Sequence, residues 1–121
     1  MRRLLVLALL VLACAPKSDT RKARETALQH DLFEMRKAIA DFRADKKRGP
    51  HSLEELTTAK YLRNIPKDPI TESANWRVTT EAAVRNDDFA SSTTPAPEPE
   101  VIDVHSRAAG RDSAGKLYSD Y

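Results

Sequence analysis

Apolar residues recur with a helical period between about Thr20 and Lys47, a stretch without glycine or proline. The spacing alternates between four and three residues, which places these side chains in one stripe along a helix. The stripe consists of Leu28, Leu32, Met35, Ile39 and Phe42. Because a helix of ~27 residues is ~40 Å long, the rest of a small chain should not cover it. We therefore expect its N-terminal part, around Ala27 and Leu28, to protrude and to offer a docking surface.

Shorter elements are expected after this helix, which Gly49 and Pro50 should end. Ser52 and Glu55 have the spacing of a capping box, so a short second helix should run to about Ala59. Two prolines within residues 61–69 favour extended and turn structure there. These signals place one long helix, one short helix and an irregular stretch in succession.

Two later segments alternate as strands do. Residues 76–79 form the first, and residues 101–106 form the second. Ile102 and Val104 should face the core, together with Trp76. Residues 91–100 are rich in proline and predict an exposed loop.

The first residues have the layout of a secretory signal peptide. A basic head precedes an unbroken run of Leu, Val and Ala from Leu4 to Leu12, about half of the ~20 residues that a membrane-spanning helix needs. Val11-Leu12-Ala13-Cys14 resembles the bacterial lipoprotein box, in which cleavage precedes the cysteine and its sulfur receives a diacylglycerol. We therefore predict a signal peptide over 1–13, a lipid-anchored tether over 14–20 and a domain over 21–121. The alternative is an ordinary signal peptide with an incidental cysteine.

Composition and charge exclude several classes of function. The net charge of +2 is accounted for by Arg2 and Arg3, which cleavage would remove, so no nucleic-acid partner is predicted. A single cysteine excludes an internal disulfide and a zinc site of thiolates. A chain of 121 residues is also too short for a large enzyme with its own cofactor domain.

No catalytic or cofactor-binding residue is predicted. Asp103, His105 and Ser106 match a hydrolase triad in composition only, because on a strand Ser106 points away from the other two. With three glycines in the chain, no glycine-rich phosphate loop is present. We expect neither an enzyme nor a small-molecule substrate.

Several short segments of the globular part have the order and spacing of one known family. These segments are 24–28, 31–39, 45–50, 52–56, 61–71, Trp76, 102–106 and 118–121. On them, residues 23–76 and 102–121 resemble the major pseudopilin of type II secretion, the G-type pseudopilin. The resemblance implies an α+β fold, with a long N-terminal helix packed on a small antiparallel sheet. It also implies a role in a pilus-like filament that drives export across the outer membrane.

The N-terminal end departs from that family. Pseudopilins begin with Gly and then Phe-Thr-Leu-x-Glu, followed by an apolar helix of membrane-spanning length, about twenty residues. Here no acidic residue precedes Asp19, and Cys14 occupies the processing site. We therefore expect a periplasm-facing lipoprotein that is a structural or accessory part of a secretion or pilus-like machine and does not polymerise.

Two alternatives are a membrane-tethered binding lipoprotein that reuses the fold outside secretion, and a small envelope hydrolase, which no catalytic group supports. The expected partners are other envelope or secretion-machine proteins and, through the lipid anchor, a membrane. Ala15 follows Cys14 where an Asp would suggest inner-membrane retention, so the outer membrane is favoured.

The resemblance also implies a C-terminal calcium loop. Ser106 matches a family serine, while Asp112 and Asp120 are the only carboxylates that follow it. Together with Asp103 they would supply part of the six to eight oxygens that calcium takes. We expect no cofactor and a loop held by turns and by packing of Leu117 and Tyr118. A calcium site on these four residues is the alternative.

Overall fold

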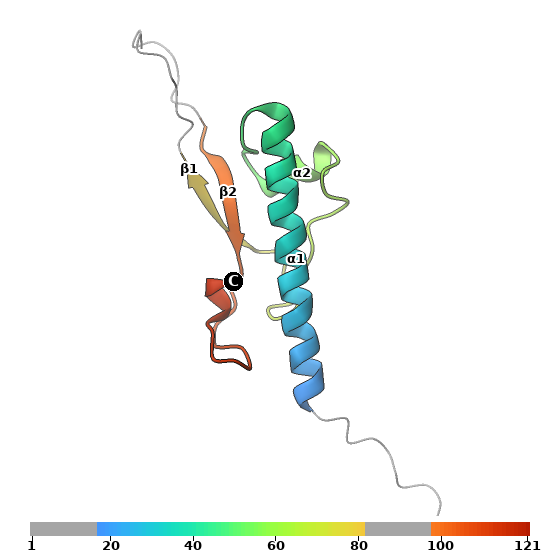
Figure 1. Cartoon of the computed structure of the whole chain (residues 1–121), viewed down its shortest axis with the longest axis vertical. Coiled ribbons are helices and arrows are strands. Elements are labelled where there is room, and N and C mark those ends of the chain that lie inside the picture. Colours follow the sequence, from blue (N-terminus) through green and yellow to red (C-terminus); the bar gives the residue numbers. More distant parts are fainter. Residues whose placement is uncertain (1–16, 82–97) are drawn as a thin grey trace, which may run out of the picture.

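The computed structural model describes residues 17–81 and 98–121 (Figure 1). The predicted α+β fold is confirmed: one long helix lies against a small antiparallel sheet. The elements are α1 (Lys17–Lys46), α2 (Leu53–Thr58), β1 (Arg77–Glu81), β2 (Glu100–His105) and the 3-10 turn η1 (Tyr118–Asp120). The predicted signal peptide, Cys14 and most of the predicted proline-rich loop lie outside the described residues.

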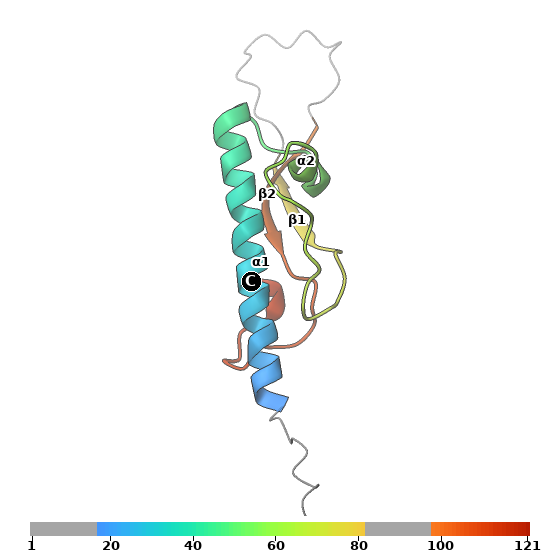
Figure 2. The ribbon, with the colours of Figure 1, turned by 90° about the vertical axis from the view of Figure 1, so that its right-hand side faces the viewer.

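The sheet has two strands in the described residues. Arg77 lies opposite His105, and Glu81 lies opposite Glu100. β2 is the strand next to α1, and β1 lies on its far side (Figure 1). Turned by a quarter, the molecule shows α2 and the chain that leads to β1 on the face of the sheet away from α1 (Figure 2). The long helix therefore has the sheet on one side of it only.

The alternation of inward-facing and outward-facing side chains is interrupted in the middle of β2. Thr79 pairs with Asp103 while Thr80 pairs with Val101, which leaves Ile102 as an extra residue on β2. Such a bulge changes which side chains face inward. Val101 and Val104 are both buried, whereas Ile102 is 37% exposed. The prediction that Ile102 faces the core was therefore wrong, and the prediction for Val104 is confirmed.

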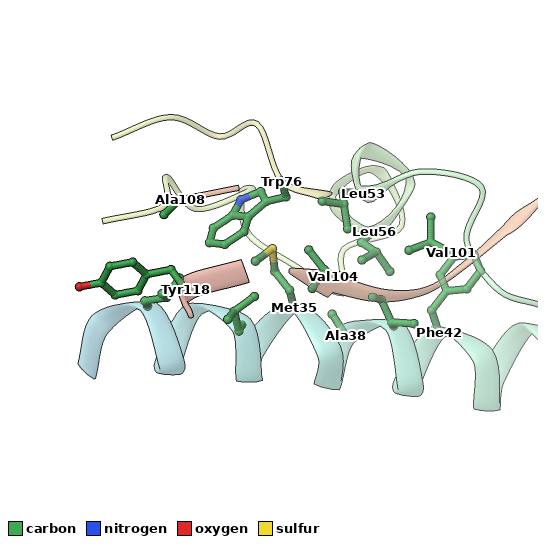
Figure 3. Packing of buried hydrophobic residues seen from close by; sticks show 13 residues of the cluster. Met35, Ala38, Phe42, Leu53, Leu56, Trp76, Val101, Val104, Ala108 and Tyr118 are labelled. Carbon is green, nitrogen blue, oxygen red and sulfur yellow. The ribbon is translucent and has the colours of Figure 1, made fainter. Parts of the chain in front are cut away.

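The core is built on the apolar stripe of α1, as the periodicity predicted. All five residues of the stripe are buried, and so is Trp76, whose Nε1 donates a hydrogen bond to the Pro66 carbonyl at 2.9 Å. Leu53 and Leu56 lie toward the Phe42 end of the stripe (Figure 3). Ala108 and Tyr118 lie toward its other end. The buried cluster thus extends along most of the helix.

The N-terminal half of this stripe does not protrude. The C-terminal segment, residues 107–121, folds back beside it, and Leu28 is 0% exposed. Ala27 is exposed but Leu28 is fully buried, so these two residues do not form the expected docking surface. The prediction failed because it assumed that nothing beyond the sheet would cover the helix. α1 also begins at Lys17, within the stretch expected to be a tether.

The connection between the helices uses Gly49 differently from the prediction. α1 ends before Lys47, which has a left-handed backbone with φ of 59° and donates its N–H to the Arg43 carbonyl. Gly49 lies instead against the start of β2. A Cβ at this position would be 2.8 Å from the Glu100 Cβ, and the Gly49 N–H donates to the Glu100 carboxylate at 2.7 Å. Glycine is therefore required here by close approach of the chain.

The capping box before α2 is confirmed with one change. The Ser52 hydroxyl accepts a hydrogen bond from the Glu55 N–H at 3.3 Å. The Glu55 carboxylate accepts from the N–H of His51 at 2.7 Å, one residue before the expected partner, and forms an ion pair with Arg48. These hydrogen bonds, with Arg48 foremost, hold the Glu55 pKa below its usual value.

Truncation at either end of the stripe should destabilise the domain comparably. Leu28→Ala and Phe42→Ala each remove a fully buried side chain and should cost about 2–5 kcal/mol. Phe33→Ala is the matched control, because Phe33 lies on the same helix and is 62% exposed; it should change stability by less than about 0.5 kcal/mol. Urea unfolding followed by circular dichroism measures all three. If Leu28→Ala lowers the free energy of unfolding only slightly while Phe42→Ala lowers it strongly, the observed burial of Leu28 would be contradicted.

Candidate functional site

A buried carboxylate on α1 holds the C-terminal segment in place. Glu25 is 7% exposed and accepts hydrogen bonds from the Ser113 hydroxyl at 2.6 Å, the Ser113 N–H at 2.9 Å and the Tyr118 hydroxyl at 3.0 Å. The Arg21 Nε donates to the same carboxylate at 3.1 Å. The hydrogen bond from Ser113 is the largest reason that the Glu25 pKa is lowered, and it outweighs the opposing effect of burial. The charged form of Glu25 is therefore the form that fits this site.

A second buried carboxylate organises the C-terminal segment itself. Asp112 accepts from the N–H groups of Ala114 at 2.9 Å and Lys116 at 2.8 Å, and from the Tyr121 hydroxyl. The Tyr121 hydrogen bond is the main cause of a lowered Asp112 pKa, and the same bond raises the Tyr121 pKa. The Gln29 side chain of α1 also donates to the Tyr121 hydroxyl at 3.3 Å. The loop around Asp112 is thus held by hydrogen bonds within the chain.

The four calcium candidates contact different partners. Asp103 lies on β2, where partial burial opposes its charge but the Arg36 guanidinium at 2.7 Å keeps its pKa lowered. Ser106 is buried and donates to Asp68, and Asp112 lies in the loop just described. Asp120 is exposed in η1.

In residues 17–81 and 98–121, no three carboxylates, histidines or cysteines gather in a way that would hold a metal ion. The structure therefore does not bring the four candidates together as one ligand set. That the domain folds without calcium stays a prediction. Leu117 is half-buried and Tyr118 is buried, as expected for a loop held by packing.

The strand geometry separates the three residues of the hydrolase-like set. The His105 Nε2 lies 3.3 Å from the Asp103 carboxylate, while the Ser106 hydroxyl points to Asp68 on the other side of the strand. The other ring nitrogen of His105 lies 2.8 Å from the main-chain oxygen of Tyr121. The predicted separation of base and nucleophile is therefore confirmed.

No local pattern in the sequence predicted a role for Asp68. This residue is fully buried and lies 38 positions before its partner Ser106. Its other carboxylate oxygen accepts from the N–H groups of Ile70 at 2.8 Å and Thr71 at 3.3 Å, which closes the turn after Pro69. An aspartate before a proline is common in turns, so only the contact across the fold identifies its buried role.

An open hollow lies between α2, the chain that precedes β1, and the strands. Its volume is about 210 Å³, and its walls include Leu53, Trp76 and Val78. Small-molecule sites usually enclose about 300–1,000 Å³. The hollow is therefore small for a metabolite, and polar side chains such as His51 and Glu54 line it together with the apolar ones beside the exposed strand β1.

Removing the Glu25 charge should make the thermal midpoint depend less on pH in the acidic range. Because the folded-state pKa of Glu25 is below the usual 4.5, its stabilisation is complete above that value and is lost as pH falls through the folded-state pKa. Glu25→Gln should thus lower the thermal midpoint at pH 7 and reduce the further drop on acidification. Glu34→Gln is the control, since Glu34 is an exposed carboxylate on the same helix. An acid profile of Glu25→Gln equal to that of the unmodified chain would contradict the assignment.

In comparisons with known proteins, no family model, no curated protein and no solved structure matches the chain. Among the described helices, none is both long and apolar enough to cross a membrane. A function for this chain therefore rests on its own residues and contacts.

Proposed function

We propose that this protein is a periplasm-facing lipoprotein with a pseudopilin-G-like domain. It acts as a structural or accessory component of a type II secretion or pilus-like machine in the bacterial cell envelope. The observation that carries the proposal is the packing of the 30-residue helix α1 on an antiparallel sheet. This arrangement agrees with the fold that the pseudopilin resemblance implies. The lipoprotein box ending at Cys14 supports the anchor.

The use of the apolar face of α1 supports an accessory role over a filament subunit. Every residue of the stripe from Leu28 to Phe42 is buried inside the domain itself. The exposed large hydrophobic side chain on the described part of α1 is Phe33, among polar neighbours. A filament of pilin type is held together by apolar helices that pack at its centre. The described part of α1 has already used its apolar surface for folding.

A second candidate function is a tethered binding protein that uses this fold outside secretion. The hollow beside α2 favours it, because its walls combine Trp76 and Leu53 with polar side chains next to the exposed Val78. An extended peptide fits such a place better than a metabolite does, since β1 offers main-chain groups alongside. In both candidates the membrane is reached through lipid on Cys14. Ala15 after that cysteine favours the outer membrane.

Cys14 should carry acyl chains and be the first residue of the mature protein. The reason is the apolar-x-small-Cys order after a short apolar run. Mass spectrometry of the membrane fraction should find lipid on this residue. Cys14→Ser should leave the precursor uncleaved or the protein outside the membrane fraction. A mature chain without acyl groups, or with another first residue, would refute the lipoprotein assignment.

Site-specific photo-cross-linking in the native cell should separate the two functions. A photoreactive residue in place of Phe33 samples the outer face of α1, and one in place of Val78 samples the hollow. An accessory component should give a discrete product with a secretion or pilus protein. A product with a protein from outside such a machine, formed from the Val78 position alone, would favour the tethered binding protein. A regular series of cross-linked oligomers of this chain would instead indicate that it is a filament subunit.

A further inference from the structure

We propose that the end of the molecule nearest Cys14 binds anionic phospholipid headgroups. The surface is a basic collar, defined as Arg21, Lys22 and Arg24 on α1 together with Arg111 in the C-terminal segment. This inference rests on the proposed lipid anchor, and it adds a direct contact between the folded domain and the membrane surface. Its partner is identified by charge: a bilayer whose phospholipid headgroups carry a net negative charge.

The collar joins two distant parts of the chain. The Arg21 Nη2 donates to the main-chain oxygen of Arg111 at 2.5 Å, so the C-terminal segment is held against the first turns of α1. Both views show this segment beside the N-terminal part of the helix (Figures 1 and 2). Because Glu25 and Ser113 fix the same junction, the basic side chains are presented from a folded surface.

Three of the four collar cations have no ion-pair partner among the side chains that the structure describes. Lys22, Arg24 and Arg111 are exposed, and in the described part of the chain none of the three forms an ion pair. The Arg111 guanidinium donates to the carbonyl of Gly115 at 2.7 Å, a neutral oxygen that leaves its charge available. Arg21 alone is paired, with Glu25.

Two of the carboxylates near the collar face inward, and a third carboxylate, Asp19, lies on the first turn of α1. Glu25 and Asp112 are both buried, and each accepts several hydrogen bonds from the C-terminal segment. Their negative charge is therefore directed toward the interior of the junction, whereas the cations project outward. The four collar cations outnumber the three carboxylates Asp19, Glu25 and Asp112, so this end carries a net positive charge that attracts an anionic surface.

The distance along the chain brings the collar to the membrane. Cys14 precedes Lys17, the first residue of α1, by three residues. Three residues span at most ~11 Å. Lys22 and Arg24 lie only ~8 and ~11 Å further along the helix axis. With the tether fully extended, Lys22 and Arg24 would be ~19 and ~22 Å from Cys14, about two Debye lengths at ordinary ionic strength. Contact with the headgroups therefore requires a tether shorter than its maximum span, and it is strongest at low salt.

The consequence is a defined orientation of the domain. Acyl chains hold the protein at the bilayer but do not fix the direction of α1. Contact through the collar would place the N-terminal end of α1 at the bilayer and direct the helix axis away from it. The helix is ~45 Å long, so α2 and the hollow beside it would then be held away from the bilayer. That end of the domain would face the periplasm.

Vesicle binding tests the collar without the lipid anchor. The chain from Cys14 to Tyr121, which contains every described contact, is prepared with its single thiol blocked by N-ethylmaleimide. It is sedimented at low ionic strength with vesicles rich in phosphatidylglycerol and with vesicles of phosphatidylcholine alone. Binding is expected to the anionic vesicles only and should be lost at high salt. Equal binding to both kinds of vesicle, or to neither, would overturn the proposal.

Paired charge variants locate the binding surface. Lys22→Gln with Arg24→Gln should lower the partition onto anionic vesicles about 25-fold, since each basic residue contributes roughly fivefold. Lys46→Gln with Lys47→Gln makes the same change in net charge at the far end of α1, and should leave binding unchanged. Equal losses in the two double variants would overturn the collar in favour of overall charge. Because the thiol is blocked, absence of lipid on native Cys14 would refute the anchor without altering this result.

Discussion

The structure is governed by the need to cover a 30-residue helix with a short chain. A two-stranded sheet can cover only part of such a helix. In the described residues the cover is therefore assembled from three pieces: β2 against the middle, α2 toward the Phe42 end, and the C-terminal segment, which contacts Glu25 and Gln29 on either side of Leu28. Each piece buries a different part of one apolar stripe. The fold is thus elongated along α1, with a thin core that continues from one piece to the next.

Local patterns predicted the parts of this fold that depend on neighbouring residues. The stripe of α1 follows from its spacing, and Ser52 with Glu55 marked the start of α2. The errors concern contacts between distant parts. Ile102 was placed inside because alternation does not reveal a bulge, and Leu28 was expected to protrude because its cover arrives some ninety residues later, with Tyr118.

Local patterns did not predict the candidate site, for the same reason. The position of Glu25 on the helix indicates an ordinary ion pair with a nearby arginine, and the pair with Arg21 does form. Its role as a buried acceptor depends on Ser113, which is 88 residues away. Asp68 and Ser106 are a second case of this kind. In the described residues every buried side-chain nitrogen or oxygen has a hydrogen-bond partner, so these polar contacts position segments that no strand ladder holds.

The order in which these segments become available bears on how the protein folds. Ser113 and Tyr118 join Glu25 across 88 and 93 residues, and contacts of such separation form late because the intervening chain must first be ordered. A chain that leaves the ribosome, or crosses a membrane, with its N-terminus leading presents α1 well before its cover. Leu28 then remains in water until the last part of the domain has followed. Such exposed apolar surface is where chaperones bind and where premature aggregation starts.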